Sequence, residues 1–408
     1  MESFLFIIMK LFEELKLRGL VKQSTNEEKI SSLLNDNKIT FYIGFDPTAD
    51  SLHVGHLMQL AMIKRLAQAG HKPIILLGGA TALIGDPSGK SDMRKMLSEV
   101  DAHIFKEKIS CQISSLISEK HEIRNNLSSF NGITFLSFIR DIGVHFSVNN
   151  MLRADCFKSR MEKGLTFLEL NYMLMQAFDF YLLRKNDNCI LQIGGDDQWS
   201  NILAGIDLVH KKDACEVFGM TLPLLISSTG QKMGKTEKGT IWLDSGKTSV
   251  FDFFQFWRNI PDSDVVNCIN QLTFISLNDI QKMNIGPFAE IDALNNAKKI
   301  LAFEMTKFVH GQEAATKVLS EAESLFEKKD ASVSFPIEVE NNINILDLLI
   351  KCNFATTKTN ARNTILGKGI KINDEVITNP TLVINSNDEI IVKMGKKRFQ
   401  KVVFKENI

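Results

Sequence analysis

Residues 39–77 read ITFYIGFDPTADSLHVGHLMQLAMIKRLAQAGHKPIILL, and this stretch decides the fold. Two short apolar runs, Ile39–Phe45 and Lys72–Leu77, lead into Gly and Pro residues, as buried strands do. Between them, Leu57–Gln68 has the apolar spacing of a helix and stops before Gly70. The order strand, helix, strand predicts a β-α-β unit.

The same alternation continues further along the chain. Phe167–Leu183 is a strongly apolar stretch of helical length, and Cys189–Ile193 is a predicted strand that ends in two glycines. Thr221–Ile226 is a further predicted strand. Strands that alternate with helices favour a parallel sheet covered on both faces, so we predict an α/β fold.

After Gly246 the pattern becomes helical. Helices are predicted at Val250–Arg258, Ser263–Leu272 and Ala293–Phe308, and the polar stretch Glu327–Asn342 is predicted to be a linker. Beyond it, helices at Ile345–Cys352 and Thr359–Leu366 and strands at Ile370–Ile372, Thr381–Ile384 and Glu389–Val392 predict a small α+β domain. We therefore divide the chain into residues 1–226, 227–248, 249–326, 327–342 and 343–408.

Composition limits the classes of protein. A chain of 408 residues is long enough for two or three domains. Its six cysteines lie too far apart for paired metal-ligand spacing, which indicates reduced thiols and no metal site. The apolar run Phe4–Met9 is shorter than an export signal core, and Met9 is an alternative start. We expect a cytoplasmic protein that does not enter a membrane.

Charge is distributed unevenly. The formal net charge is zero, which does not indicate attraction of the whole surface to nucleic acid or membrane. From Ile343 to Ile408, however, 11 Lys and Arg stand against 6 Asp and Glu. A basic end on a slightly acidic body suggests a dedicated contact with a polyanion.

His53-Val54-Gly55-His56 lies between a predicted strand and a predicted helix. Backbone amides at a helix start favour phosphate, and two imidazoles there can donate hydrogen bonds to charge on a leaving pyrophosphate. The alternative is that both rings only cap the helix. A metal pair is disfavoured because no third ligand lies nearby in sequence.

Lys232-Met233-Gly234-Lys235-Thr236 follows Ser227-Ser228-Thr229-Gly230. Two lysines and a hydroxyl on a Gly-rich segment suit a clamp on a triphosphate, although lysine-rich loops are more often only solvated surface. Gly85–Ser91 superficially resembles a P-loop but fails the test, because its first glycine is one residue too close to the Gly-Lys pair.

Tyr172, Gln176 and Asp179 are spaced so that they lie within about 40° of one another on a helix. Their neighbours are apolar, and a helix that is apolar nearly all round is buried. Buried polar groups need partners, which can be protein, water or ligand. An internal network is possible for any one of them, but three aligned groups favour a polar ligand.

Tyr42–His56, YIGFDPTADSLHVGH, resembles the opening signature of bacterial tyrosyl-tRNA synthetases, a class I synthetase family. Gly85–Lys90, Tyr172–Asp179, Gln192–Trp199 and the Lys232 segment match in the same order, and the match covers nearly the whole chain. The resemblance implies a Rossmann-like catalytic domain, an α-helical domain beside the anticodon stem, a small α+β RNA-binding domain, and a homodimer formed around residues 128–170.

The resemblance also implies site residues. Tyr42 and Asp179 would hydrogen-bond the phenol of L-tyrosine. The amino acid would also be held by Asp86, Asn126, Tyr172, Gln176, Gln192 and Gln198, with Asn126 supporting Asp86. The ATP site would include Gly44, Asp46, His53, Gly55, His56, Gly195, Asp197, Lys232 and Lys235, and the groups acting on the phosphates would be Thr48, His53, His56, Lys90, Arg94, Lys232, Lys235 and Thr236.

The implied reaction is activation of tyrosine with ATP, followed by transfer to tRNA(Tyr). The tyrosine carboxylate attacks the α-phosphate, so positioning and charge stabilisation suffice without an enzyme nucleophile. Mg²⁺ would accompany ATP, bound mostly through the phosphates. In the tail, the implied RNA contacts are Lys358, Arg362, Lys393, Lys396, Lys397 and Arg398, against the alternative of a solvated basic face.

The sequence departs from the family pattern at two places, and two alternative functions stay open. Asp196 stands where the family commonly has serine, so an extra carboxylate is expected close to the nucleotide site. Gly234 and Thr236 replace serines of the general class I pattern, as the tyrosyl branch often does. The alternatives are a related class I synthetase for tryptophan and a non-catalytic RNA-binding protein on a synthetase scaffold.

Overall fold

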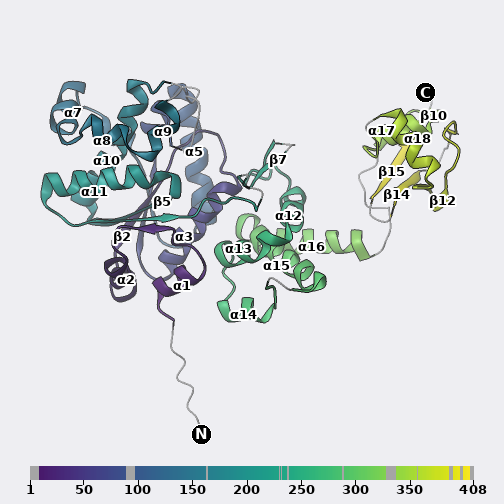
Figure 1. Cartoon of the computed structure of the whole chain (residues 1–408), viewed down its shortest axis with the longest axis horizontal. Coiled ribbons are helices and arrows are strands. Elements are labelled where there is room, and N and C mark those ends of the chain that lie inside the picture. Colours follow the sequence, from purple (N-terminus) through teal and green to yellow (C-terminus); the bar gives the residue numbers. More distant parts are fainter. Residues whose placement is uncertain are drawn as a thin grey trace, which may run out of the picture. The chain divides into compact units, whose positions relative to one another are not determined.

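The computed structural model describes residues 9–88, 97–161, 164–228, 230, 232–236, 239–286, 289–327, 337–355, 357–385, 389–395 and 398–404. The chain forms two compact units, with the boundary between Ala315 and Thr316. The larger unit contains a sheet and the helices that cover it, together with a helical segment, and the smaller unit contains the basic tail (Figure 1).

A six-stranded sheet with the order β1-β6-β5-β2-β3-β4 organises the larger unit. Its strands are β1 (Gln23–Ser24), β2 (Thr40–Phe45), β3 (Lys72–Leu77), β4 (Glu122–Asn125), β5 (Cys189–Gly195) and β6 (Phe218–Leu222). All neighbouring pairs are parallel except β1 with β6. The strand order reverses between β2 and β5, and in such sheets the crevice beyond the carboxyl ends at this point is the usual ligand site.

The predicted β-α-β unit is confirmed, with α3 (Leu57–Gln68) between β2 and β3. The strand predicted at Thr221–Ile226 is wrong in its bounds, because β6 begins at Phe218 and ends at Leu222. Pro223 follows directly and has no N–H for a ladder hydrogen bond, so the pairing with β5 stops there.

Helices cover both faces of the sheet. Figure 1 shows α10 (Phe167–Asp187) and α11 (Trp199–Asp213) on one face and α3 on the other. The other helices before residue 200 are α1 (Leu11–Leu17), α2 (Glu27–Asp36), α4 (Thr81–Ile84), α5 (Glu99–Leu116), α6 (Leu127–Phe130), α7 (Phe135–Asp141), α8 (Val148–Leu152) and α9 (Asp155–Met161). The apolar helix predicted from Phe167 is confirmed; Thr166 and Glu169 form a capping box at its start, and left-handed Asn188 ends it.

The helical segment after Gly246 is confirmed, and its residues up to Ala315 belong to the same compact unit as the sheet. Its helices are α12 (Val250–Arg258), α13 (Asp262–Leu272), α14 (Leu277–Lys282), α15 (Ile291–His310) and α16 (Gln312–Glu327). Trp257, Phe253 and Phe254 of α12 are fully buried, and α12 and α13 both pack on α15.

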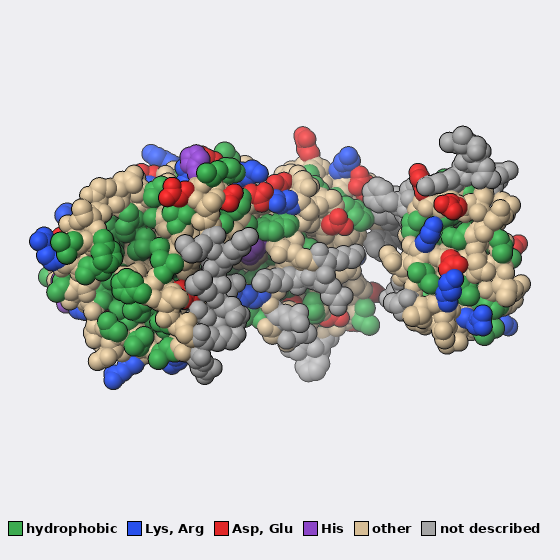
Figure 2. Space-filling model, turned by 90° about the horizontal axis from the view of Figure 1, so that it is seen from above, with side chains coloured by type: hydrophobic (Ala, Val, Ile, Leu, Met, Phe, Trp, Pro, Cys, Tyr) green, Lys and Arg blue, Asp and Glu red, His purple; other side chains and the backbone are tan. Residues whose placement is uncertain are grey.

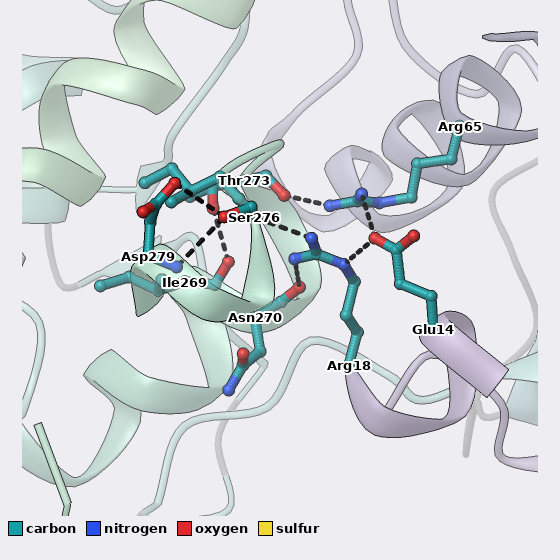
Figure 3. A network of polar contacts seen from close by, with 9 residues as sticks. Glu14, Arg18, Arg65, Ile269, Asn270, Thr273, Ser276 and Asp279 are labelled. Atoms are coloured by element: carbon teal, nitrogen blue, oxygen red, sulfur yellow. Dashed lines mark hydrogen bonds and ion pairs between the residues drawn. The ribbon is translucent and has the colours of Figure 1, made fainter. Parts of the chain in front are cut away.

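Two buried arginines fasten this segment to the sheet (Figure 3). Arg18, just after α1, donates to the carbonyl oxygens of Asn270 (3.2 Å) and Ile275 (2.7 Å), and Arg65 of α3 donates to that of Thr273. Both guanidinium groups share the Glu14 carboxylate, at 2.7 Å from Arg18 and 3.7 Å from Arg65. Carbonyls at the end of a helix carry partial negative charge, so these cations hold the last turn of α13.

The smaller unit is an α+β domain with its own core. It contains α17 (Ile345–Lys351) and α18 (Lys358–Leu366) against a sheet of order β12-β11-β14-β15-β9, and a two-stranded sheet of β10 (Ile343–Asn344) and β13 (Val383–Ile384). The five-stranded sheet is formed by β12 (Glu375–Val376), β11 (Ile370–Ile372), β14 (Ile390–Met394), β15 (Arg398–Phe404) and β9 (Ile337–Val339). The fully buried residues Ile345, Leu348 and Ile365 lie in the shared core.

The linker predicted at Glu327–Asn342 is wrong over part of its length. β9 falls within it and pairs in parallel with β15, where Val402 is the partner of Ile337. Val339 is buried in the core of the smaller unit, although its polar flanks conceal this in the sequence. In the described part of the chain, every helix is too short or too polar to cross a membrane.

Candidate active site

A cavity of about 340 Å³ opens beyond the carboxyl ends of β2 and β5. It lies where the strand order reverses, and its volume suits a small ligand. Most of the residues that the sequence analysis proposed for tyrosine and ATP line it together: Tyr42, Gly44, Asp46, Thr48, His53, Gly55, His56, Asp86, Asn126, Tyr172, Gln176, Asp179, Gln192, Gly195, Asp197, Gln198 and Lys232.

Polar atoms without partners gather deep in this cavity. Tyr42 of β2 and Asp179 of α10 are 1% and 4% exposed, and the Tyr42 hydroxyl and one Asp179 carboxylate oxygen have no hydrogen-bond partner within the described structure. The side-chain carbonyl oxygens of Gln176 and Gln192 are also buried and unpaired there. Each such group lowers the stability of the folded protein by about 1–3 kcal/mol. A polar ligand that hydrogen-bonds to these atoms would remove this cost.

Burial shapes the protonation of this pair. Removal from water raises the pKa of Asp179 to about 8, against which the hydrogen bond from Asn126 acts weakly. Burial, and secondarily the nearby Asp179, raises the pKa of the Tyr42 hydroxyl well above its ordinary value. In the empty cavity at neutral pH, Asp179 is therefore largely a neutral acid and Tyr42 a neutral phenol.

Asn126 differs from the expectation that it supports Asp86. Its amide nitrogen donates to Asp179 at 2.9 Å and to Thr81 at 3.1 Å, and its oxygen accepts from the backbone N–H of Ala80. Asn126 directly follows β4, next to β3 in the sheet, and this position brings it against α10. Asn126 therefore orients the Asp179 carboxylate.

Asp86 and Asp46 each hold a neighbouring side chain at the cavity wall. Asp86 accepts from the Gln198 amide (2.6 Å) and from the backbone N–H of Ser88 (2.9 Å). Asp46 accepts from the Tyr172 hydroxyl at 2.8 Å. Asp46, which was predicted for the ATP site, therefore contacts a residue that was predicted for the tyrosine site. Two carboxylates in the cavity lining favour a cationic group of the ligand.

The two histidines cap the helix and also line the cavity. The Nδ1 atom of His53 accepts from the backbone N–H of Gly55 (3.0 Å), and the Nδ1 atom of His56 accepts from that of His53 (3.1 Å). The ring proton of each neutral imidazole therefore sits on Nε2. Burial and the adjacent His53 lower the pKa of His56 to about 3, so it stays neutral. Capping and ligand binding are compatible here, because they use different ring nitrogens.

Glycines let the motifs pack closely. A Cβ on Gly55 would lie 2.8 Å from the His53 ring, so the ring can fold back only over glycine. Gly234 has a φ of +84°, and a Cβ there would lie 2.9 Å from the Cβ of Val54. The lysine-bearing segment thus rests directly on the histidine motif.

Backbone pairing joins the same two segments. Val54 donates to the carbonyl of Ile241, and Leu243 donates to that of Leu52. Lys232 is exposed and the neighbouring Met233 is buried, and both line the cavity. Lys235 and Thr236 lie in β7 (Lys235–Thr236), where only the backbone is described, and Lys90 and Arg94 fall outside the described residues.

Asp196 is turned away from the cavity. Its carboxylate accepts from Gln23 of β1 at 2.6 Å and from Thr221 of β6 at 2.9 Å, and it is absent from the cavity lining, whereas Asp197 is part of it. The extra carboxylate expected at the nucleotide site therefore serves the sheet edge. It fastens the amino-terminal strand to the turn that carries Asp197.

The sequence analysis missed Thr81 and Ser88, which line the cavity. Thr81 donates to Asp46 at 2.8 Å, and the hydroxyl of Ser88 accepts from Asn201 at 3.2 Å. Both are at most 3% exposed. Their position in the Gly-rich stretch that follows β3, at the carboxyl edge of a parallel sheet, was the available signal.

In the smaller unit, Lys358 and Arg362 are exposed on α18, and Lys393 lies on β14. Lys371 of β11 is paired with Lys393 in the ladder, so the two side chains lie on the same face of the sheet. The sequence analysis missed Lys371. Asp374 lies 2.8 Å from Lys393 and offsets part of the charge. Lys396 and Lys397 fall outside the described residues, and only the backbone of Arg398 is described.

Two family models match the chain. One, described as tRNA synthetases class I (W and Y), matches residues 34–327, and the other, a tyrosine–tRNA ligase SYY-like C-terminal domain, matches residues 323–402. The chain is similar to the tyrosine–tRNA ligases of Clostridium botulinum (47% identical, 96% of this chain and 99% of the relative) and Acetivibrio thermocellus (48%, 96% and 98%).

A comparison with solved structures finds the same family. The chain is similar to a C-terminally truncated mitochondrial tyrosyl-tRNA synthetase of Aspergillus nidulans, with a TM-score of 0.70 and 28% identity over 78% of this chain and 94% of that one. A tryptophanyl-tRNA synthetase of Encephalitozoon cuniculi, with a TM-score of 0.56 and 14% identity over 75% of this chain and 87% of that one, shares the fold.

The raised pKa of Asp179 predicts how stability depends on pH. Because the folded protein holds this proton more tightly than the unfolded chain, Asp179 stabilises the fold at acid pH, and this contribution is lost as the pH rises through about 8. Asp179→Asn cannot ionise. We expect the ligand-free variant to melt at the same temperature as wild type near pH 4 and at a higher one at pH 9, measured by scanning calorimetry. Asp213→Asn, at an exposed position, should show no such divergence.

Proposed function

Because the chain belongs to the tyrosine–tRNA ligase family of class I tRNA synthetases, we propose that its cavity binds tyrosine between β2 and α10 and ATP beneath the histidine and lysine motifs. The activity is the ATP-dependent formation of tyrosyl-adenylate and pyrophosphate, followed by transfer of tyrosine to the 3′-terminal adenosine of tRNA(Tyr). We expect this reaction to take place in the cytoplasm.

The unpaired Tyr42 hydroxyl and Asp179 oxygen carry the proposal for the phenol. A tyrosine hydroxyl can donate to the Asp179 carboxylate and accept from Tyr42, which satisfies both buried atoms. A donor from the ligand favours the ionised carboxylate, so bound tyrosine would lower the raised pKa of Asp179. Phenylalanine would leave both atoms unpaired, at about 1–3 kcal/mol each.

The amino-acid backbone would lie toward the opposite wall. Asp86, Tyr172 and Gln176 are placed to receive the ammonium, because a carboxylate, a hydroxyl and an unpaired amide oxygen are all acceptors. Gln192 and Gln198 would orient the carboxylate through their amide nitrogens. Gln198 is already held by Asp86 and Asn201, so its position is set before the ligand arrives.

The phosphates would lie over the histidine motif. Each Nδ1 accepts a backbone N–H, so the Nε2–H groups of His53 and His56 would be the donors toward the phosphates. Thr48 and Lys232 line the same end, and Lys90, Arg94, Lys235 and Thr236 would complete the set. Gly44 and Gly195 allow close approach of the nucleotide, and Asp197 would hold the ribose.

Neutral donors and cations suit this reaction, because the tyrosine carboxylate itself attacks the α-phosphate and negative charge passes to the leaving pyrophosphate. Mg²⁺ would accompany ATP and bind through the phosphates. Among the described residues, no group of three or more His, Cys, Asp or Glu side chains is arranged to hold a metal ion.

An exposed apolar face supports a homodimer. Of the eighteen large hydrophobic side chains exposed in the described residues, eight lie between residues 127 and 167, including Phe135 (69% exposed), Leu136 (76%) and Val144 (72%). Figure 2, seen from the side on which α7 to α9 lie in Figure 1, shows hydrophobic side chains gathered at the left of the view. Exposed apolar clusters of this kind mark protein interfaces, so we propose a second copy as the occupant.

The smaller unit would bind the tRNA. Lys358 and Arg362 on α18, Lys371 and Lys393 on the sheet, and the basic residues 396–398 offer phosphate contacts on a structured RNA. The matched C-terminal domain model supports this assignment.

A synthetase for tryptophan is the less favoured alternative, because an indole has no hydroxyl for Tyr42 and Asp179. A non-catalytic RNA-binding protein would have no use for the unpaired constellation in the cavity.

Substrate selectivity tests the phenol site. We expect Asp179→Asn to lower kcat/KM for tyrosine by about 10–100-fold in ATP–pyrophosphate exchange, because a charge-assisted acceptor is lost. Its kcat/KM for phenylalanine should fall less, which narrows the discrimination. Tyr42→Phe, which removes only a hydroxyl, should act in the same direction by about 10-fold. Unchanged selectivity in both variants, or exchange that depends on tryptophan, would contradict the assignment.

The role of the tail can be separated from activation. Because β9 pairs with β15, the chain is cut before β9: a chain ending after Glu327 lacks the whole five-stranded sheet and keeps no strand of it. We expect tyrosine-dependent pyrophosphate exchange to stay within about twofold of the full chain, because the cavity lies in the larger unit. Charging of purified tRNA(Tyr) should fall at least about 100-fold. Equal charging by both chains would refute the role of the tail.

The proposed dimer face makes its own prediction. A charge at the centre of an apolar interface is left desolvated and unpaired, so Leu136→Glu should shift the protein toward monomer in sedimentation velocity. Ile291→Glu is the matched control, because Ile291 is also 76% exposed but lies on α15. A wild-type protein that is monomeric at micromolar concentration, or a Leu136→Glu variant that remains a dimer, would exclude this face.

A further inference from the structure

The lysine loop, residues 227–236, contacts helix α13 through Ser228 and Met233. Asp264, in the first turn of α13, accepts a hydrogen bond from the backbone N–H of Ser228 at 2.9 Å. Ser263 adds a second bond, from its hydroxyl to that of Ser228, also at 2.9 Å. Asp264 is only 5% exposed, so a buried carboxylate holds the beginning of the loop.

A second contact lies one helical turn further along α13. The thiol of Cys268 contacts the Met233 sulfur at 3.9 Å, and both side chains are buried. Asp264 and Cys268 are four residues apart and share one face of the helix. That face thus supports the loop on both sides of Lys232, which lies between Ser228 and Met233.

The other end of α13 is fixed to α3, the helix that follows the histidine motif. The last turn is held by Arg18 and Arg65, as Figure 3 shows for Asn270 and Thr273. Arg65 belongs to α3, and α3 begins directly after His56. Helix α13 therefore connects the helix that follows the histidines to the loop that carries Lys232, both of which line the cavity.

We propose that Asp264 is a positioning residue that sets Lys232 over the phosphate end of the cavity. The proposal rests on the function proposed for Lys232. The second oxygen of Asp264 is buried and has no partner in the described part of the chain. The carboxylate can therefore accept a further bond from the loop's hydroxyls or amides when ATP is bound, without releasing Ser228.

The plainer explanation is that Asp264 only stabilises the start of α13, since acidic residues in a first turn interact favourably with the helix dipole. That role would affect folding of the helix but would leave the position of Lys232 unchanged. Asp292 provides the comparison, because it lies in the first turn of α15 in the same helical segment and is exposed.

The test uses the full chain in tyrosine-dependent ATP–pyrophosphate exchange, with tyrosine affinity measured separately by equilibrium dialysis. We expect Asp264→Ala to lower kcat/KM for ATP by about 10-fold, because a displaced loop loses alignment, while the Kd for tyrosine stays within about twofold. Asp264→Asn keeps an acceptor for Ser228 and should recover most of the loss. Asp292→Ala should match wild type.

A second pair of variants acts from the loop side, where α13 is untouched. Ser228→Pro removes the backbone N–H that donates a hydrogen bond to Asp264. Ser228→Ala keeps this N–H and removes only the hydroxyl that accepts from Ser263. We expect the proline variant to show the same loss toward ATP and the alanine variant a smaller one. This pair decides the matter if Asp264→Ala fails to fold.

Two results would overturn the proposal: kcat/KM for ATP unchanged in Ser228→Pro and in any folded Asp264→Ala, or tyrosine affinity falling in parallel with it. Lys232→Ala separates this outcome from failure of the proposed function. If Lys232→Ala leaves the ATP dependence unchanged, the function assigned to Lys232 is wrong. If it impairs ATP use while the Asp264 and Ser228 variants do not, only the positioning role is wrong.

Discussion

Unpaired polar atoms buried at one end of a parallel sheet are the constraint on which the rest of the structure depends. The Tyr42 hydroxyl and the Asp179 carboxylate oxygen lie where water is excluded and no described protein group meets them. Such atoms destabilise the empty protein. They persist because the surrounding structure holds them firmly: Tyr42 is part of the central strand β2 between two parallel neighbours, and Asn126, just after the end of β4, donates to Asp179.

In the histidine motif each side chain has two roles. Each ring accepts a backbone N–H with one nitrogen and carries its proton on the other, so one pair of side chains both starts a helix and can donate at the phosphate site proposed above. Gly55 makes this possible, because any side chain there would displace the His53 ring. The lysine loop then packs on Val54 through Gly234, which brings two motifs that are far apart in the sequence to one end of the cavity.

Much of this arrangement could be predicted from the sequence. Apolar runs punctuated by Gly and Pro located β2, α3, β3, α10 and β5 closely, because burial on both faces leaves a continuous apolar signal. The position of Asn126 against Asp179 could not be predicted, because it depends on which strand ends are neighbours in space. The direction of Asp196 was equally hidden: adjacent carboxylates at the end of β5 point to opposite sides, and the spacing alone does not say which one enters the cavity. β9 escaped notice because three residues with polar flanks carry too little periodicity.

The pairing of β9 with β15 has a consequence for biosynthesis. In the sequence β9 is the first strand of the five-stranded sheet and β15 is the last, and β9 lies at the sheet edge beside β15, so that edge cannot close until Arg398–Phe404 have been translated. The catalytic part is complete in sequence before the smaller domain starts, and domains generally fold as they emerge. Translation that terminates before β15 would therefore release a chain whose larger unit is complete but whose five-stranded sheet is open along one edge.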